Sequence, residues 1–180
     1  MKIYYIRHGQ TDWNLMRKMQ GGQTDNPLNK TGINQAKETK EKLKDINFDV
    51  VICSPMTRAR QTAKIITEGK NTPIIVDERL RERKLGQAEG NPVTPEFEKK
   101  IWDYNLNMNL EGGEDLHEFN ERIQEFIKDL KERYSEYESV LIVAHGGIAK
   151  ILKAYLYGMP ESNQLDEIEM KNCEIIEAEI

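Results

Sequence analysis

The sequence predicts a three-layer α/β/α sandwich with a mainly parallel central sheet. Two observations predict this fold class. Short β-rich apolar runs alternate with longer amphipathic runs along the 180 residues, and no repeat or linker interrupts the alternation. Strands that alternate with helices form a mainly parallel sheet, because each crossover helix returns the chain to the same end of the sheet and covers one of its faces.

The composition is that of an ordinary globular protein. With 38% apolar and 32% charged residues, 180 residues are enough for one sizeable core, so we expect a single domain over residues 1–180. The net charge of −5 argues against a nucleic acid partner. No apolar run approaches the ~20 residues of a membrane helix, so no membrane partner is expected.

The first half of the chain contains two predicted strands and two predicted helices. Residues 2–6 are a strand, and residues 31–46 carry a helical pattern of apolar side chains. The apolar run 49–53 is typical of a buried strand. A helix over about 54–66 follows it, with Ser54 as the expected N-cap.

The second half continues the alternation. Strands are expected at 74–76, 140–144 and about 173–178, and the helix that follows the middle one should end near Gly158. A long helix is predicted over 114–137. Its apolar residues at core spacing are Leu116, Phe119, Ile123, Phe126, Ile127 and Leu130.

Three polar segments follow predicted strands, where a parallel sheet places its ligands. They are Arg7-His8-Gly9, Ser54 to Arg58, and His145-Gly146-Gly147. The least regular stretch, about 91–113, is expected to form a small cap over this edge.

Two of the three histidines, His8 and His145, stand beside glycine at a strand end. One such histidine alone would favour an ordinary hydrogen-bonded role, but two favour function. Arg58 lies in the first turn of a helix, where a cation is unfavourable unless it binds an anion. With Arg7 it would form a fork for phosphate oxygens, although either arginine alone is typical of a surface.

The chain resembles the histidine phosphatase superfamily, also called the phosphoglycerate mutase-like family, because it carries these motifs and others in the family's order along nearly its whole length. The resemblance implies a phosphoglycerate mutase-like fold. The matching motifs are Arg7-His8-Gly9, Thr11-Asp12-Trp13-Asn14, Asp25-Asn26-Pro27-Leu28, Thr31-Gly32, Ser54 to Ala63, Leu80-Arg81-Glu82, Gly86, Glu89-Gly90, Gly112-Gly113-Glu114 and Val143 to Gly147.

The resemblance implies a role for each matching residue. His8 would be the nucleophile that becomes phosphohistidine, and Glu82 would protonate the leaving oxygen and then activate water. The phosphoryl oxygens would be held by Arg7, Arg58, His145, Asn14 and the Gly146 N–H, with Gln20 and Gly21 in the phosphate-binding set. The family requires no metal or other cofactor.

Physical chemistry agrees with these roles. A transferred phosphoryl group carries spread negative charge, so cations and correct positioning supply most of the catalysis. His8 must be neutral to attack, and Glu82 needs a raised pKa to keep a proton near neutral pH. Three histidines without ligand-like spacing give no reason to expect a metal.

The sequence also departs from the family pattern near the expected pocket rim. The segment from Gln20 to Asp25 is one residue longer than usual, Arg17-Lys18 replaces a frequent Gly-Arg pair, and Ala144 replaces a common Ser. These departures concern the identity of the substrate. A small phosphorylated metabolite is the expected substrate class.

Three alternatives stay open. Cys53 and Arg58 suggest a cysteine phosphatase loop, but four residues separate them where that loop needs five, and Cys53 is expected to be a core thiol. A mutase would share the fold, but the short cap favours hydrolysis, as in the broad-specificity and ribazole-phosphatase types. An inactive phosphate-binding module would lack part of the catalytic set, which is intact here.

Location and assembly are further expectations. Two distant cysteines, Cys53 and Cys173, form no disulfide framework, and the N-terminal apolar run lacks a cleavage site, so a reduced cytoplasmic setting is predicted. The apolar last strand and Tyr155-Leu156-Tyr157 would suit a homodimer contact.

Overall fold

Five strands form a central sheet in the computed structural model, which describes residues 1–180. The strand order is β3 (Ile74–Val76), β2 (Val50–Cys53), β4 (Ser139–Ala144), β1 (Lys2–Arg7) and β5 (Ile175–Glu179). Neighbouring strands pair in parallel except β1 and β5, which are antiparallel. The predicted α/β fold with a mainly parallel sheet is therefore confirmed.

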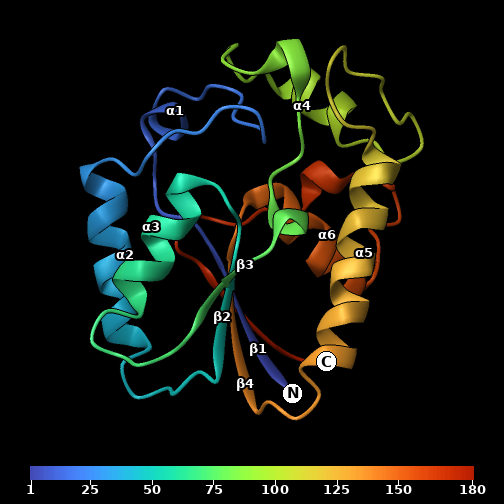
Figure 1. Ribbon diagram of the computed structural model, residues 1–180. Coiled ribbons are helices and arrows are strands. Elements are labelled where there is room, and N and C mark those ends of the chain that lie inside the picture. The colour runs from blue at the N-terminus through green and yellow to red at the C-terminus, as the bar shows by residue number, and fades with distance from the viewer.

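Helices cover both faces of the sheet (Figure 1). On one face lie α2 (Lys30–Lys42) and α3 (Thr57–Ile66), and on the other lie α5 (Leu116–Arg133) and α6 (Gly146–Tyr157). Successive side chains of a strand point to opposite faces. Thus Tyr4 packs in the apolar cluster on the α2 and α3 side, and Tyr5 packs in the larger cluster with α5 and α6.

The carboxyl ends of the parallel strands meet at the edge opposite the two chain termini (Figure 1). Two short helices, α1 (Asp12–Leu15) and α4 (Pro95–Ile101), lie above this edge. The irregular stretch 91–113 contains α4, whose N-cap Thr94 accepts from the Phe97 N–H. The remaining short elements are the 3₁₀ helices Glu78–Leu80, Gly86–Ala88 and Leu165–Glu167.

The boundary predicted at Ser54 is wrong. The helix α3 begins at Thr57, because Met56 still has extended backbone, with φ −67° and ψ 139°, and the Ser54 hydroxyl lies 2.7 Å from His145 Nε2. The Asp25 carboxylate takes over the capping role: it accepts from both the N–H and the hydroxyl of Thr57, each at 2.7 Å. Ser54 therefore belongs to the site rather than to the helix.

Other bounds differ by a few residues. The helix α2 ends at Lys42 rather than 46, and α5 spans Leu116–Arg133 rather than 114–137. The six core positions predicted on α5 are all buried. The last strand begins at Ile175, because Cys173 has a φ of 57° and forms a turn instead of extended backbone. No helix combines the length and apolar character needed to cross a membrane.

Candidate active site

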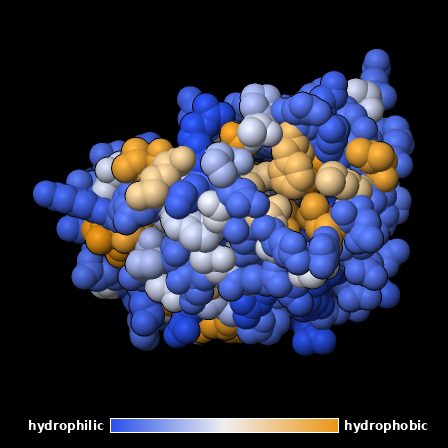
Figure 2. Space-filling model, turned by 90° about the horizontal axis from the view of Figure 1, so that it is seen from above, coloured by the Kyte–Doolittle hydropathy of each residue, from blue (hydrophilic) through white to orange (hydrophobic).

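A cavity of about 630 Å³ lies at the carboxyl edge of the sheet. Seen from above, this face is largely hydrophilic, with separate groups of apolar side chains toward its two sides (Figure 2). The cavity walls come from the end of β1, from α1 and its following loop, from the 91–113 stretch, from the start of α6, and from the segment 168–172. The size suits a small ligand.

His8 directly follows β1 and is 2% exposed. Its Nδ1 lies 2.7 Å from the carbonyl oxygen of Gly9. A carbonyl can only accept, so Nδ1 carries the proton and donates, and Nε2 keeps a free lone pair. Burial, followed by the charges of Arg58 and Arg7, lowers the pKa of His8 well below its usual value. The imidazole is therefore neutral at pH 7 and able to act as a nucleophile.

Gly9 is needed for this arrangement. A Cβ at position 9 would lie 2.5 Å from the backbone oxygen of Gly32, which lies in the first turn of α2. Any side chain would push apart the two backbone segments. The glycine after the histidine thus lets α2 approach the end of β1 closely.

Arg7 and Arg58 supply two buried positive charges. Arg7 Nη1 donates to the Met170 carbonyl at 2.5 Å, and Arg58 donates to the carbonyls of Thr24 and Gly21, each at 3.0 Å. Burial lowers the pKa of Arg58 to about 10, so it stays charged at neutral pH. The Nε atoms of both arginines are buried without a partner. An unpaired buried donor costs about 1–3 kcal/mol, which an anion would remove.

His145 follows β4 and is fully buried beside His8, with the ring centroids 5.2 Å apart. The Tyr5 hydroxyl donates to its carbonyl at 2.5 Å. Burial and the charge of Arg58 lower the pKa of His145 well below its usual value. Its Nδ1 is a third buried nitrogen without a partner. Unpartnered nitrogens at the ends of β1 and β4 and in the first turn of α3 therefore lie around His8.

Glu82 is 8% exposed and is held by two backbone donors. Its Oε1 accepts from the Arg83 N–H and its Oε2 from the Gly147 N–H, each at 2.9 Å. Burial raises its pKa, although these N–H groups and the charges of Arg58 and Arg7 act in the opposite direction. A carboxyl with a raised pKa is suited to carrying a proton at neutral pH.

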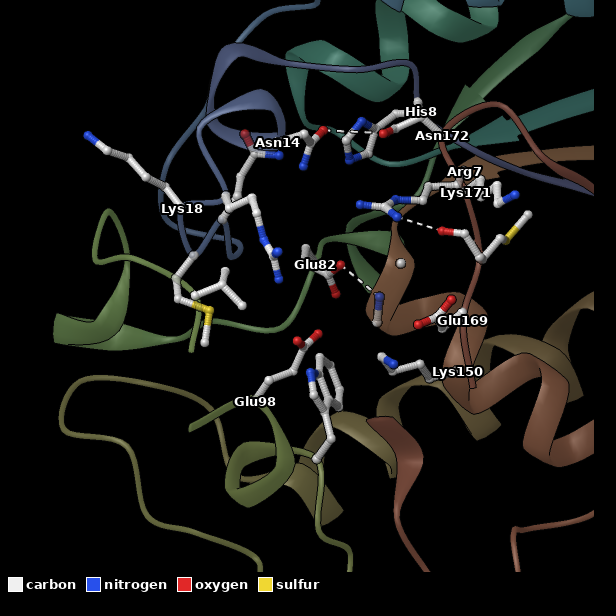
Figure 3. A pocket seen from close by; sticks show the side chains of 18 of the residues that line it. Arg7, His8, Asn14, Lys18, Glu82, Glu98, Lys150, Glu169, Lys171 and Asn172 are labelled. Carbon is white, nitrogen blue, oxygen red and sulfur yellow. Dashed lines mark hydrogen bonds between the residues drawn. The ribbon is translucent and has the colours of Figure 1, made fainter. Parts of the chain in front are cut away.

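The other predicted residues take different positions. Asn14, Gln20 and Gly146 line the cavity together with Arg7, His8 and Glu82 (Figure 3). Gly21 does not line it, and its carbonyl accepts from Arg58 instead. Arg58 and His145 are fully buried and are absent from the open lining.

Comparison with known proteins decides the family. A family model described as histidine phosphatase superfamily (branch 1) matches residues 3–180. The chain belongs to the histidine phosphatase superfamily. The resemblance inferred from the ordered motifs is therefore confirmed, and so is the phosphoglycerate mutase-like fold.

Relatives and solved structures match this histidine phosphatase over nearly its whole length. A Bacillus subtilis (strain 168) protein named uncharacterized phosphatase PhoE is 40% identical over 178 residues, which is 97% of this chain and 89% of that protein. A probable phosphoglycerate mutase GpmB of Erwinia tasmaniensis is 30% identical over 97% of this chain and 83% of that protein. The crystal structure of the alpha-ribazole phosphatase from Shigella flexneri has a TM-score of 0.85 at 29% identity, and the match covers 100% of this chain and 91% of that one.

Some residues of this histidine phosphatase site were not predicted from the sequence. Asn172 lines the cavity, and its Nδ2 donates to the His8 carbonyl at 2.9 Å. Thr62 accepts from the Gly9 N–H at 3.0 Å. Lys150 lines the cavity and donates to backbone carbonyls of the segment 165–168. Asn172 and Lys150 lie outside the family motifs, and Thr62 lies within the motif from Ser54 to Ala63 but had no predicted role, so only tertiary contacts reveal what these residues do.

The cysteine alternative receives no support from the site. Cys53 is fully buried in the apolar cluster on the α2 and α3 side of the sheet, and burial raises the pKa of its thiol. It does not line the cavity. The structure also contains no group of three or more His, Cys, Asp or Glu side chains placed to hold a metal ion.

Proposed function

We propose that the protein is a metal-independent phosphatase that hydrolyses small phosphate monoesters through a phosphohistidine on His8. The observation that carries the proposal is the tautomer of His8. Its Nδ1 proton is committed to the Gly9 carbonyl, and its pKa is lowered, so Nε2 is an unprotonated nucleophile. The names of the phosphatase relatives support the same reaction class.

In the first step His8 Nε2 forms a bond to phosphorus while the bond between phosphorus and the leaving oxygen breaks. Arg7, Arg58 and His145 offer their unpartnered nitrogens to the phosphoryl oxygens, whose negative charge they stabilise. Glu82, whose pKa is raised, gives its proton to the leaving oxygen. The alcohol then departs, and the phosphoryl group stays on His8.

In the second step water displaces His8 from phosphorus. The Glu82 carboxylate, which lost its proton in the first step, accepts a proton from the attacking water. Inorganic phosphate leaves, and His8 returns to the neutral form with a free Nε2. The cavity admits water from outside, because several of its lining residues, including Glu169 and Lys171, are exposed.

The test is phosphate release from p-nitrophenyl phosphate in the presence of EDTA, together with trapping of the labelled enzyme by rapid denaturation in alkali. We expect steady turnover, and an alkali-stable, acid-labile phosphoryl group on the peptide that contains His8. Label on another residue, or turnover that EDTA abolishes, would contradict the proposed function.

A mutase is the second candidate, because GpmB relatives are named probable phosphoglycerate mutases. The short stretch 91–113 leaves the cavity open to water, which favours hydrolysis of the phosphohistidine. Assay with 3-phosphoglycerate distinguishes the two. Isomerisation that clearly exceeds phosphate release would replace the phosphatase with the mutase. Binding of vanadate without label or turnover on a broad panel of phosphomonoesters would instead indicate an inactive module. The cytoplasmic location and the homodimer stay predictions.

A further inference from the structure

A strained turn precedes the last strand and borders the cavity. The Glu174 N–H donates to the Lys171 carbonyl at 3.1 Å, and the Lys171 N–H donates to the Glu174 carboxylate at 2.7 Å. Within this turn Cys173 has a φ of 57°, in the left-handed region that side chains other than glycine rarely adopt. Such strain persists only where surrounding contacts hold it, and it gathers at functional sites.

The turn is tied to the nucleophile segment at several points. The Cys173 N–H donates to the Arg7 carbonyl at 2.9 Å, and the Met170 carbonyl accepts from the Arg7 side chain at 2.5 Å. Between them Asn172 projects toward His8 (Figure 3). Its Nδ2 donates to the His8 carbonyl at 2.9 Å and to Asn14 Oδ1 at 3.3 Å. Both amide protons of Asn172 are therefore used.

These contacts decide which way the Asn14 amide faces. Asn14 Oδ1 accepts from the Thr11 N–H at 3.1 Å as well as from Asn172. A flipped amide would place its NH₂ group against two donors, which is unfavourable. The oxygen therefore stays with its two donors, and Asn14 Nδ2 remains free on the side chain that lines the cavity.

We infer that Asn172 is a positioning residue, which fixes the Asn14 amide so that its NH₂ group faces a bound phosphoryl oxyanion beside His8. This inference rests on the proposed function for the identity of the anion. Asn172 acts through Asn14 and the backbone of His8, since both of its donors are occupied by protein acceptors. Asn14 Oδ1 accepts from one nearby donor, the Thr11 N–H, and the turn provides the second donor, the Asn172 side-chain amide.

The test is a double-mutant cycle with Asn14→Ala, Asn172→Ala and the double variant. It measures kcat/KM for p-nitrophenyl phosphate and, independently of turnover, the Kd for orthovanadate. We expect each single variant to lose about 10–100-fold in both quantities, and Asn172→Ala to cost at least threefold less when Asn14 is already alanine. Asn107→Ala is the control, because Asn107 also bridges a carboxylate and an N–H but lies outside the cavity lining.

A second variant separates positioning from folding. In Asn172→Asp the carboxylate keeps the size of the side chain but has no proton for Asn14. Its loss relative to wild type should shrink as the pH falls and the carboxyl regains a proton, at pH values where thermal unfolding shows that the variant and the wild type are both fully folded. If the loss in the double variant equals the product of the two single losses, and the wild-type enzyme turns over, the inference about Asn172 is overturned and the proposed function stands. Wild-type protein that binds no vanadate would overturn it together with the proposed function.

Discussion

The two ends of the cavity are built in different ways. At the inner end His8, Glu82 and His145 are each at most 8% exposed. Backbone groups hold the side chains of His8 and Glu82, and the Ser54 hydroxyl contacts the His145 ring. At the outer end Glu98 is half-buried and Glu169 is exposed, and both lie beyond Glu82 as seen from His8 (Figure 3). Long charged side chains at a surface keep much of their rotamer freedom.

This difference separates chemistry from substrate choice. Groups that are buried and fixed by the backbone can be placed precisely for phosphoryl transfer. Mobile charged groups at the rim add weak, screened interactions with a leaving group. Changes at the inner end should therefore act on kcat by large factors, and changes at the outer end should act on KM by small ones.

Replacement of the proposed nucleophile, His8, should give the largest effect. His8→Ala should abolish covalent labelling and lower kcat/KM for p-nitrophenyl phosphate by at least about 10⁴-fold, because no other group can take the phosphoryl group. His117→Ala is the control: this histidine is half-buried, contacts the Tyr104 carbonyl and does not line the cavity. Substantial turnover by His8→Ala would exclude the phosphohistidine route.

Glu82→Gln should have an effect that depends on the leaving group. For alkyl phosphates, which need a proton, we expect a loss of about 10²–10⁴-fold in kcat. For p-nitrophenyl phosphate, which leaves readily, the rate of labelling should change little. A rapid-quench comparison of the two substrates checks this. Equal losses for both would show that Glu82 is not the acid.

The pH profile of alkyl phosphate hydrolysis should report the same two groups. His8 must be unprotonated, and its lowered pKa keeps it so down to acidic pH. Glu82 must be protonated, and its raised pKa extends that form to higher pH. The rate of labelling should therefore fall as the pH rises through the raised pKa of Glu82. Glu82→Gln should remove this alkaline limb.

The same contrast explains how far the sequence could predict the molecule. Strands at 50–53 and 139–144 are apolar and short, and polar residues follow them directly, so the fold and the inner end were accessible from local pattern and family motif. The error at Ser54 has a tertiary cause, since its hydroxyl contacts His145, which is distant in the sequence. Local capping preference could not anticipate that contact.

Asn172 and the outer rim could not be predicted for a related reason. Asn172 reaches the site only because β5 pairs antiparallel with β1 and brings the preceding turn beside Arg7. Glu98 enters the lining through α4, within a stretch that carried no strand signal. Such positions depend on pairing and packing rather than on local spacing.

Gly147→Ala tests how tightly the inner end is packed. A Cβ there would lie 2.3 Å from Glu82 Oε1 and 2.7 Å from the Trp102 ring, so the carboxyl must shift. We expect a loss of about 10–100-fold in kcat for alkyl phosphates. Gly146→Ala is the matched comparison, because its Cβ would meet Arg7 atoms at an ordinary 3.4 Å. An equal loss in both variants would contradict the proposed packing constraint.

Glu98→Gln should give a small effect confined to substrate binding. Removal of this negative charge should lower KM for 3-phosphoglycerate and raise KM for phosphoethanolamine, each by about 2–5-fold, because it removes repulsion from a carboxylate and attraction to an ammonium. The kcat for p-nitrophenyl phosphate should not change. A large loss of kcat would place Glu98 in the chemistry and break the division between the two ends.

Thiol alkylation should give the smallest effect. Cys53 is fully buried, and burial raises the pKa of Cys173 to about 11, so neither thiol offers a reactive thiolate at neutral pH. Iodoacetamide applied to the folded protein should leave kcat/KM unchanged, and the intact mass should show no adduct. Two results together would point to Cys53, at the end of β2, as the nucleophile instead of His8. They are loss of activity when Cys53 is alkylated, and an active His8→Ala variant. Unchanged activity would exclude both thiols and would agree with the proposed nucleophile His8, whose Nδ1 contacts the Gly9 carbonyl.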